Sequence, residues 1–173
     1  MTTDLGASRG ETLTDYSVSR WVVVTTFTLS LIGLGLSVYL SIIHFDKHLL
    51  VCSTNSVVNC DLVTTSPQSR FIGIPVAFLG LANYVVMSAL NSPWAWRARA
   101  RWIHVARFAL VIVSMCFVLW LIYAEVEIIG AICLYCTGVH IVTFALLVVL
   151  TRVSPTQLGW TRPRELTPDV QTR

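Results

Sequence analysis

Four long apolar runs constrain the fold of this chain more than any other feature of its sequence. They are Trp21–Ile43, Phe71–Leu90, Trp102–Ala124 and Ile128–Leu150, and each is close to the ~20 residues that a helix needs to cross a bilayer. Only 12% of the 173 residues are charged, against about 25% in a typical soluble domain. The sequence therefore predicts an all-α membrane protein, built as a bundle of four transmembrane helices.

Small residues recur on the first two runs at near-helical spacing. The first run contains Gly33, Gly35, Ser37 and Ser41, and the second contains Gly80 and Asn83. Small side chains let helices approach closely in a membrane. We expect these positions to face neighbouring helices.

The basic residues predict the orientation of the runs. Ten of the twelve fall on one side of the predicted bundle, namely Arg9, Arg20, Arg97, Arg99, Arg101, Arg107, Arg152, Arg162, Arg164 and Arg173. Basic residues accumulate on the cytoplasmic side of membranes, so both termini are expected in the cytoplasm. The 44–70 connection, which contains Lys47 and Arg70, and the Glu125–Glu127 turn are then expected outside. Arg107 lies just inside its run and is expected to extend toward the membrane surface.

The chain accordingly divides into three parts. Residues 1–19 form a cytoplasmic polar tail, residues 20–151 a four-helix membrane catalytic domain, and residues 152–173 a second cytoplasmic polar tail. The net charge of +3 is small and scattered, so it does not indicate a nucleic acid partner. Membrane lipid is the expected surrounding.

Two cysteines, Cys133 and Cys136, lie three residues apart near the start of the fourth run. A helix start carries free N–H groups and partial positive charge, which favour a thiolate on Cys133. The pair indicates redox chemistry, with a structural thiol pair or half of a zinc site as alternatives. Cys116, in the middle of the third run, is expected to be a small apolar packing residue.

The 44–70 connection contains two further cysteines, Cys52 and Cys60. A cap at Asn55 or Ser56 would begin a short amphipathic helix lying on the bilayer. Its apolar side would consist of Val57, Val58, Leu62 and Val63. This helix would bring Cys60 toward the intramembrane pair and leave Cys52 exposed. The alternative is a static Cys52–Cys60 disulfide within the loop.

Three motifs together identify a family resemblance. They are C-S-T-N-S-V-V-N-C (52–60), S-P-Q-S-R-F-I-G-I-P (66–75) leading into the second run, and C-L-Y-C-T-G-V-H (133–140). Over roughly Val22–Leu150 the chain resembles the bacterial homologues of vitamin K epoxide reductase. In that family an intramembrane cysteine pair passes electrons to a quinone, and a loop pair takes them from the dithiol of a partner.

The resemblance implies a membrane thiol oxidase that supports disulfide formation in exported proteins, located in the bacterial cytoplasmic membrane. Cys52 would meet a thioredoxin-fold (DsbA-like) partner acting in trans, and Cys60 would exchange with Cys133. Cys136 would then face the electron acceptor, a quinone (menaquinone or ubiquinone).

The resemblance also suggests which residues contact the quinone. His140 follows Cys136 by four residues and looks like the counterpart of a quinone-contacting tyrosine in the vertebrate enzyme, with an interhelical hydrogen bond as the alternative role. Ser66, Ser69 and Asn83 are further candidates. His44 is expected to be a solvated loop residue.

Two other functions remain open at this stage. A structural zinc protein would use the four cysteines as ligands, although their spacing departs from that of zinc ribbons, and we expect no metal. A reductase of quinone epoxide would use the same thiols toward a different acceptor, and no residue separates it from the oxidase.

Overall fold

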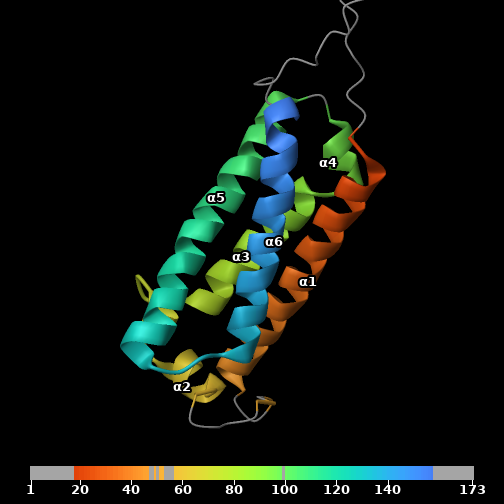
Figure 1. Ribbon diagram of the computed structural model, residues 1–173. Helices are drawn as coiled ribbons and strands as arrows, with labels where there is room; N and C mark the ends of the chain where they lie inside the picture. The colour runs from red at the N-terminus through yellow and green to blue at the C-terminus, as the bar shows by residue number, and fades with distance from the viewer. Residues whose placement is uncertain (1–17, 47–48, 50, 53–56, 99, 158–173) are drawn as a thin grey trace, which may run out of the picture.

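The computed structural model describes residues 18–46, 49, 51–52, 57–98 and 100–157, and helices dominate this part of the chain (Figure 1). The helices are α1 (Arg20–Phe45), α2 (Cys60–Thr65), α3 (Val76–Leu90), α4 (Pro93–Arg97), α5 (Arg101–Tyr123) and α6 (Leu134–Gln157). The shorter elements are a 3₁₀ turn (Pro67–Ser69), an antiparallel hairpin of β1 (Arg70–Phe71) and β2 (Ile74–Pro75), and a π-helical segment (Ala124–Ile129).

Three helical stretches in the described part of the chain are long and apolar enough to cross a membrane. They are Arg20–Phe45, Arg101–Ile129 and Leu134–Pro155. The α3 helix is also apolar but has 15 residues, which is shorter than the ~20 that usually span a bilayer. The all-α membrane character predicted from the sequence is therefore confirmed.

Two helices begin later than the apolar runs that contain them. The run from Phe71 starts with the hairpin, whose turn places Ile72 at φ 53° and Gly73 at φ 81°, and α3 begins only afterwards. Gly130, at φ 70°, ends the π-helical segment. A left-handed residue commonly terminates a helix, and for this reason α6 begins at Leu134 rather than at Ile128.

The four longer helices pack into a bundle (Figure 1). Both α1 and α5 contact α3 and α6. The short helices α2 and α4 lie at opposite ends of this bundle. Each end has its own buried cluster: Tyr84, Met87, Trp96, Val111, Val142, Leu146 and Leu150 toward α4, and Leu40, Ile43, Cys60, Val63, Ala131 and Cys133 toward α2.

The small residues of α1 form one buried stripe, made of Thr26, Ser30, Gly33, Ser37 and Ser41. A Cβ atom on Gly33 would lie 1.9 Å from Cε1 of Tyr84 in α3. The ring of Tyr84 is fixed because its hydroxyl bonds Thr143 Oγ1 at 2.9 Å and donates to the Val139 carbonyl at 3.2 Å. The prediction that Gly35 also faces a neighbouring helix is wrong. This residue is exposed, and a Cβ atom there would meet nothing within 4 Å.

The other small residues of the second run also lie between helices. A Cβ atom on Gly80 would approach Ser37 Oγ at 3.5 Å. Asn83 accepts a hydrogen bond from Ser114 of α5 at 2.8 Å. These contacts join α3 to α1 and to α5.

The basic residues that begin α1 and α5, Arg20 and Arg101, lie at the end of the bundle that also holds α4 (Figure 1). Arg107 was expected to extend toward the membrane surface. Its side chain instead turns inward and is 2% exposed. Its Nε donates to the Leu90 carbonyl at 3.0 Å, and its guanidinium lies 3.6 Å from the centroid of the Trp96 ring. It therefore ties α5 to the end of α3 and to α4.

The loop helix α2 begins later than expected. Asn59 caps it by accepting a hydrogen bond from the Leu62 backbone N–H at 3.0 Å, whereas the predicted caps Asn55 and Ser56 lie outside the described residues. Val63 faces the interior and is buried, while Leu62 is exposed.

Gly33→Ala is expected to lower the stability of the protein in detergent by about 1–3 kcal/mol, because the added methyl group overlaps the Tyr84 ring. Gly35→Ala is the matched control. Both changes improve helix propensity by about 1 kcal/mol, so the control is expected to unfold at the same temperature as the parent or slightly higher. Equal thermal midpoints for the two variants would contradict this packing.

Candidate redox site

Cys133 lies directly ahead of α6, and Cys136 lies in its first turn. The Cys133 carbonyl accepts the Thr137 backbone N–H at 2.9 Å, which is the first hydrogen bond of the helix. The Cys133 sulfur accepts the Cys136 backbone N–H at 3.4 Å, and such a side-chain bond satisfies one of the free donors of a helix start. Cys133 therefore acts as the N-cap of α6.

This position lowers the pKa of the Cys133 thiol below its ordinary value. The largest cause is a hydrogen bond from the Cys136 side chain, and the Cys136 backbone N–H adds to it. Burial acts in the opposite direction, because a desolvated thiolate is less stable. The thiolate character expected at Cys133 from the sequence agrees with this geometry.

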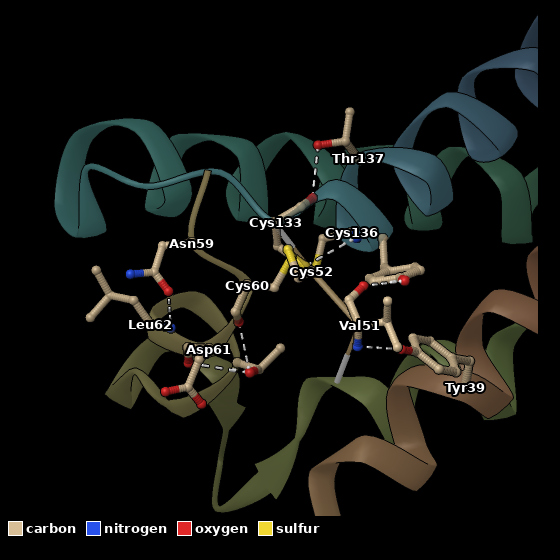
Figure 2. Close-up of a disulfide and its surroundings, with 12 residues drawn as sticks. Tyr39, Val51, Cys52, Asn59, Cys60, Asp61, Leu62, Cys133, Cys136 and Thr137 are labelled. Atoms are coloured by element: carbon tan, nitrogen blue, oxygen red, sulfur yellow. Dashed lines mark hydrogen bonds between the residues drawn. A yellow bond between two sulfur atoms is a disulfide. The ribbon is translucent and has the colours of Figure 1, made fainter. Parts of the chain in front are cut away.

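The two loop cysteines are joined by a disulfide between Cys52 and Cys60 (Figure 2). Cys60 and Cys133 are both 0% exposed and belong to one buried cluster, against which Cys52 and Cys136 also pack. Cys52 is half-buried rather than fully exposed as expected. All four cysteines are thus gathered at the α2 end of the bundle.

Backbone hydrogen bonds hold the loop beside the segment that leads into α6. Asn59 N–H donates to the Ile132 carbonyl at 3.1 Å, and Ile132 N–H donates to the Val57 carbonyl at 3.0 Å, so Val58 and Ile132 pair in parallel. Cys60 directly follows Asn59 in the loop, and Cys133 directly follows Ile132. The pairing therefore places these two cysteines next to each other.

Two tyrosines hold the other side of the loop. The rings of Tyr39 and Tyr135 lie 4.6 Å apart between centroids. Tyr135 donates to the Val51 carbonyl at 2.6 Å, and Tyr39 accepts the Val51 N–H at 3.2 Å and donates to the Leu49 carbonyl at 3.1 Å. The residue next to Cys52 is therefore bonded to both α1 and α6 (Figure 2).

A largely apolar cavity of about 360 Å³ lies beside the cysteines. Its wall contains every residue that the sequence suggested for quinone contact, namely Ser66, Ser69, Asn83 and His140, together with Cys136. Aromatic side chains of Phe71, Tyr84 and Phe117 complete part of the wall. The volume is within the roughly 300–1,000 Å³ of small-molecule sites, and the apolar aromatic lining fits a quinone ring.

The candidate residues differ in how free they are to meet a ligand. Ser66 and Ser69 donate to the carbonyls of Val63 and Ser66 at 2.8 and 2.7 Å, and Asn83 accepts from Ser114. His140 is 7% exposed, and its ring makes no hydrogen bond within the part of the chain that the structure describes. The ring nitrogens of His140 and the amide nitrogen of Asn83 are therefore the donors still available to a ligand.

The structure does not favour a zinc site. Two of the four cysteines are consumed by the disulfide, and residues 18–46, 57–98 and 100–157 hold no group of three or more side chains suited to a metal ion. The remaining cysteine, Cys116, is exposed on the outer face of α5, so the expectation that it packs in the interior is wrong.

Sequence reasoning missed three contributors to this site. His44 was expected in solvent but lines the cavity from the last turn of α1, with its ring against Phe78. Glu125 was expected in an outward turn but is 6% exposed and lines the same cavity. Tyr135 lies inside the C-L-Y-C motif, and its place between the two cysteines was the available signal for a role in the site.

A model of the vitamin K epoxide reductase family matches residues 24–151 of this chain. The match covers well over half of the 173 residues. It extends from α1 into α6 and includes the four cysteines of the site and the wall of the cavity.

Tyr135→Phe is expected to speed reduction of the Cys52–Cys60 disulfide by a water-soluble phosphine about fivefold. A neutral hydrogen bond contributes ~1 kcal/mol, and its loss raises the population of the open loop by about that factor. Tyr123→Phe is the control, because Tyr123 is exposed and, among the aromatic rings of the described residues, packs on Trp120. Indistinguishable rates in the two variants would show that the tyrosine does not hold the loop.

Proposed function

This chain belongs to the vitamin K epoxide reductase family, whose members are membrane thiol–disulfide oxidoreductases, and we propose that it is a quinone-linked thiol oxidase. In this proposal electrons enter from a thioredoxin-fold protein, cross from the loop cysteines to the Cys133–Cys136 pair, and leave to a quinone. The reaction supplies disulfides to exported proteins.

One observation carries the proposal: the loop is hydrogen-bonded to the segment ahead of α6 in a register that brings Cys60 beside Cys133. Thiol–disulfide exchange requires a thiolate to reach a disulfide sulfur directly. A structural loop disulfide has no need of this register, nor of a second cysteine pair packed against it.

The first exchange takes place at the loop. A thiolate of the partner attacks Cys52, the half-buried member of the disulfide, and the Cys52–Cys60 bond breaks to leave a Cys60 thiolate. The second thiol of the partner then displaces Cys52. The partner is now oxidised, and both loop cysteines are reduced.

The second exchange moves the electron pair into the membrane. The Cys60 thiolate attacks Cys133 of an oxidised Cys133–Cys136 pair, and Cys136 leaves as a thiolate that takes up the proton lost by the Cys52 thiol. Cys52 then attacks Cys60, which restores the loop disulfide and releases Cys133. The arrangement with Cys52–Cys60 bonded and the other two cysteines free corresponds to this point in the cycle.

The cavity supports a quinone as the acceptor. A bound quinone takes up two electrons and two protons, so it needs a nearby thiol and polar groups for its ring oxygens. Cys136 lines the cavity, and His140 lies one helical turn further along α6. We assign His140 as the first contact of a ring oxygen and Ser66, Ser69 and Asn83 as secondary contacts.

We also propose that four helices, α3 included, span the cytoplasmic membrane of a bacterium. In this arrangement both termini are cytoplasmic and α2 lies on the outer surface, where disulfides persist. Labelling of a reduced Cys52 from outside intact cells agrees with this orientation, and protection of Cys52 from the reagent contradicts it.

The purified protein is expected to reduce a short-chain benzoquinone when it is supplied with a reduced thioredoxin-fold protein. Cys136→Ser is expected to reduce the rate to background, since Cys133 alone cannot form the intramembrane disulfide. Quinone reduction is followed by absorbance under anaerobic conditions.

Cys116→Ser is the matched control and is expected to keep the parent rate, because Cys116 lies on the exposed face of α5. Cys52→Ser is expected to lose the reaction with the protein partner but to retain reduction driven by a small dithiol. Quinone reduction that survives in Cys136→Ser would refute the proposed route.

A further inference from the structure

Glu125 is a buried carboxyl group that the relay described above does not use. It belongs to the π-helical segment between α5 and α6 and is 6% exposed, whereas Glu127, two residues later, is exposed. Burying a carboxylate is costly unless it is paired or hydrogen-bonded. Its burial beside the cysteines therefore requires a reason.

The contacts of Glu125 lead directly to the reacting thiols. Its carboxylate accepts hydrogen bonds from the Cys133 backbone N–H and from the Cys136 thiol. It also lines the cavity that Cys136 and His140 share. The carboxylate thus lies between the intramembrane pair and the space where we place the quinone.

Neutralisation by a cation does not explain the burial. Within the part of the chain that the structure describes, no lysine or arginine lines the cavity. The titratable groups that face it from the surrounding helices are His44 of α1, Tyr84 of α3, and Cys136 and His140 of α6. A buried acid without a cationic partner, in contact with a reactive thiol, is typical of a group that exchanges protons.

We propose that Glu125 is a catalytic residue whose carboxylate takes the proton of the Cys136 thiol as electrons leave the cysteine pair. This inference rests on the proposed function. Oxidation of the pair, with Cys133 as a thiolate and Cys136 as a thiol, forms the Cys133–Cys136 bond and releases two electrons and one proton, and the quinone takes up both electrons and this proton.

Glu125 carries this proton. The Cys136 S–H bond breaks as an O–H bond forms on Glu125, and that O–H bond breaks when the proton passes to a ring oxygen of the quinone. The other ring oxygen of the quinone takes up its proton from water. Glu125 ends the cycle as a carboxylate again.

A purely structural role is the competing explanation, because the bond from the Cys133 N–H supports the turn before α6. Glu125→Gln separates the two roles. The amide oxygen still accepts that N–H, but the amide cannot take up a proton. Glu127→Gln removes the same charge from the same segment at an exposed position and is the matched control.

The test is the single-turnover rate of oxidation of the reduced cysteine pair by a short-chain benzoquinone, measured from about pH 7 to pH 9. With Glu125 present, the proton transfer is internal and the rate is expected to change little with pH. In Glu125→Gln the thiol must lose its proton to water, so the rate is expected to rise about tenfold per pH unit below the ordinary thiol pKa of ~8.5. The variant is expected to be at least tenfold slower at pH 7 and to approach the parent at pH 9.

A Glu125→Gln variant that is slower by the same factor at every pH, or as fast as Glu127→Gln throughout, overturns the proposal. If Glu125→Gln fails to fold, Glu125→Asp is measured instead. This variant retains a carboxylate, so its rate is expected to change as little with pH as that of the parent. A tenfold rise in its rate per pH unit overturns the proposal. Absence of quinone reduction in the parent protein would instead refute the proposed function itself, so the two failures are distinguishable.

Discussion

The parallel pairing of Val58 with Ile132 is the contact on which the rest of this structure depends. It consists of two backbone hydrogen bonds, yet it fixes the position of the loop relative to α6. Each strand of this pair continues into a helix that begins at or directly after a cysteine, Cys60 for α2 and Cys133 for α6. Backbone geometry rather than a flexible side chain therefore sets how Cys60 and Cys133 approach each other within one buried cluster.

The bundle supports this arrangement at two levels. Along its length, small residues of α1 such as Gly33 admit the Tyr84 ring, and the hydroxyl of this tyrosine bonds α6 at Val139 and Thr143. At the α2 end, the same helices separate enough to leave a cavity between Cys136 and the helices α1, α3 and α5. Close packing in one half thus fixes the walls of the space in the other half. Cys136 lines that space and Cys133 packs beside Cys60 of the loop, as the proposed electron relay between a water-soluble and a lipid-soluble partner requires.

The sequence predicted those features that depend on composition and local spacing. The apolar runs predicted the long helices, and a buried stripe was visible in the spacing of Gly33, Ser37 and Ser41. Gly35 was included wrongly, since it lies about 160° from Ser37 around an ideal helix, two residues away at 100° each. The helix starts at Leu134 and Val76 depend on left-handed turns at Gly130 and Gly73. A search for runs of apolar residues does not detect such turns.

The site was predictable in its members but not in its contacts. Motif spacing selected the four cysteines and the residues of the cavity wall, whereas Glu125 was assigned to an exposed turn because acidic residues usually face water. Glu125 nonetheless lies on the buried side of the π-helical segment, next to the buried Ala124, while Glu127 lies on its exposed side. Likewise, the role of Tyr135 depends on a hydrogen bond to Val51, a residue 84 positions away. Contacts of this kind follow from the assembled fold and not from local pattern.

The central claim is that the loop pair and the intramembrane pair exchange electrons through Cys60 and Cys133. Non-reducing peptide mapping of the Cys136→Ser protein by mass spectrometry tests it most directly. Without Cys136 the intermediate between these two cysteines cannot be resolved from the α6 side. The account predicts that a peptide around Cys60 accumulates in disulfide linkage with one around Cys133. A Cys52–Cys60 bond in all molecules, with Cys133 persistently free, would contradict it.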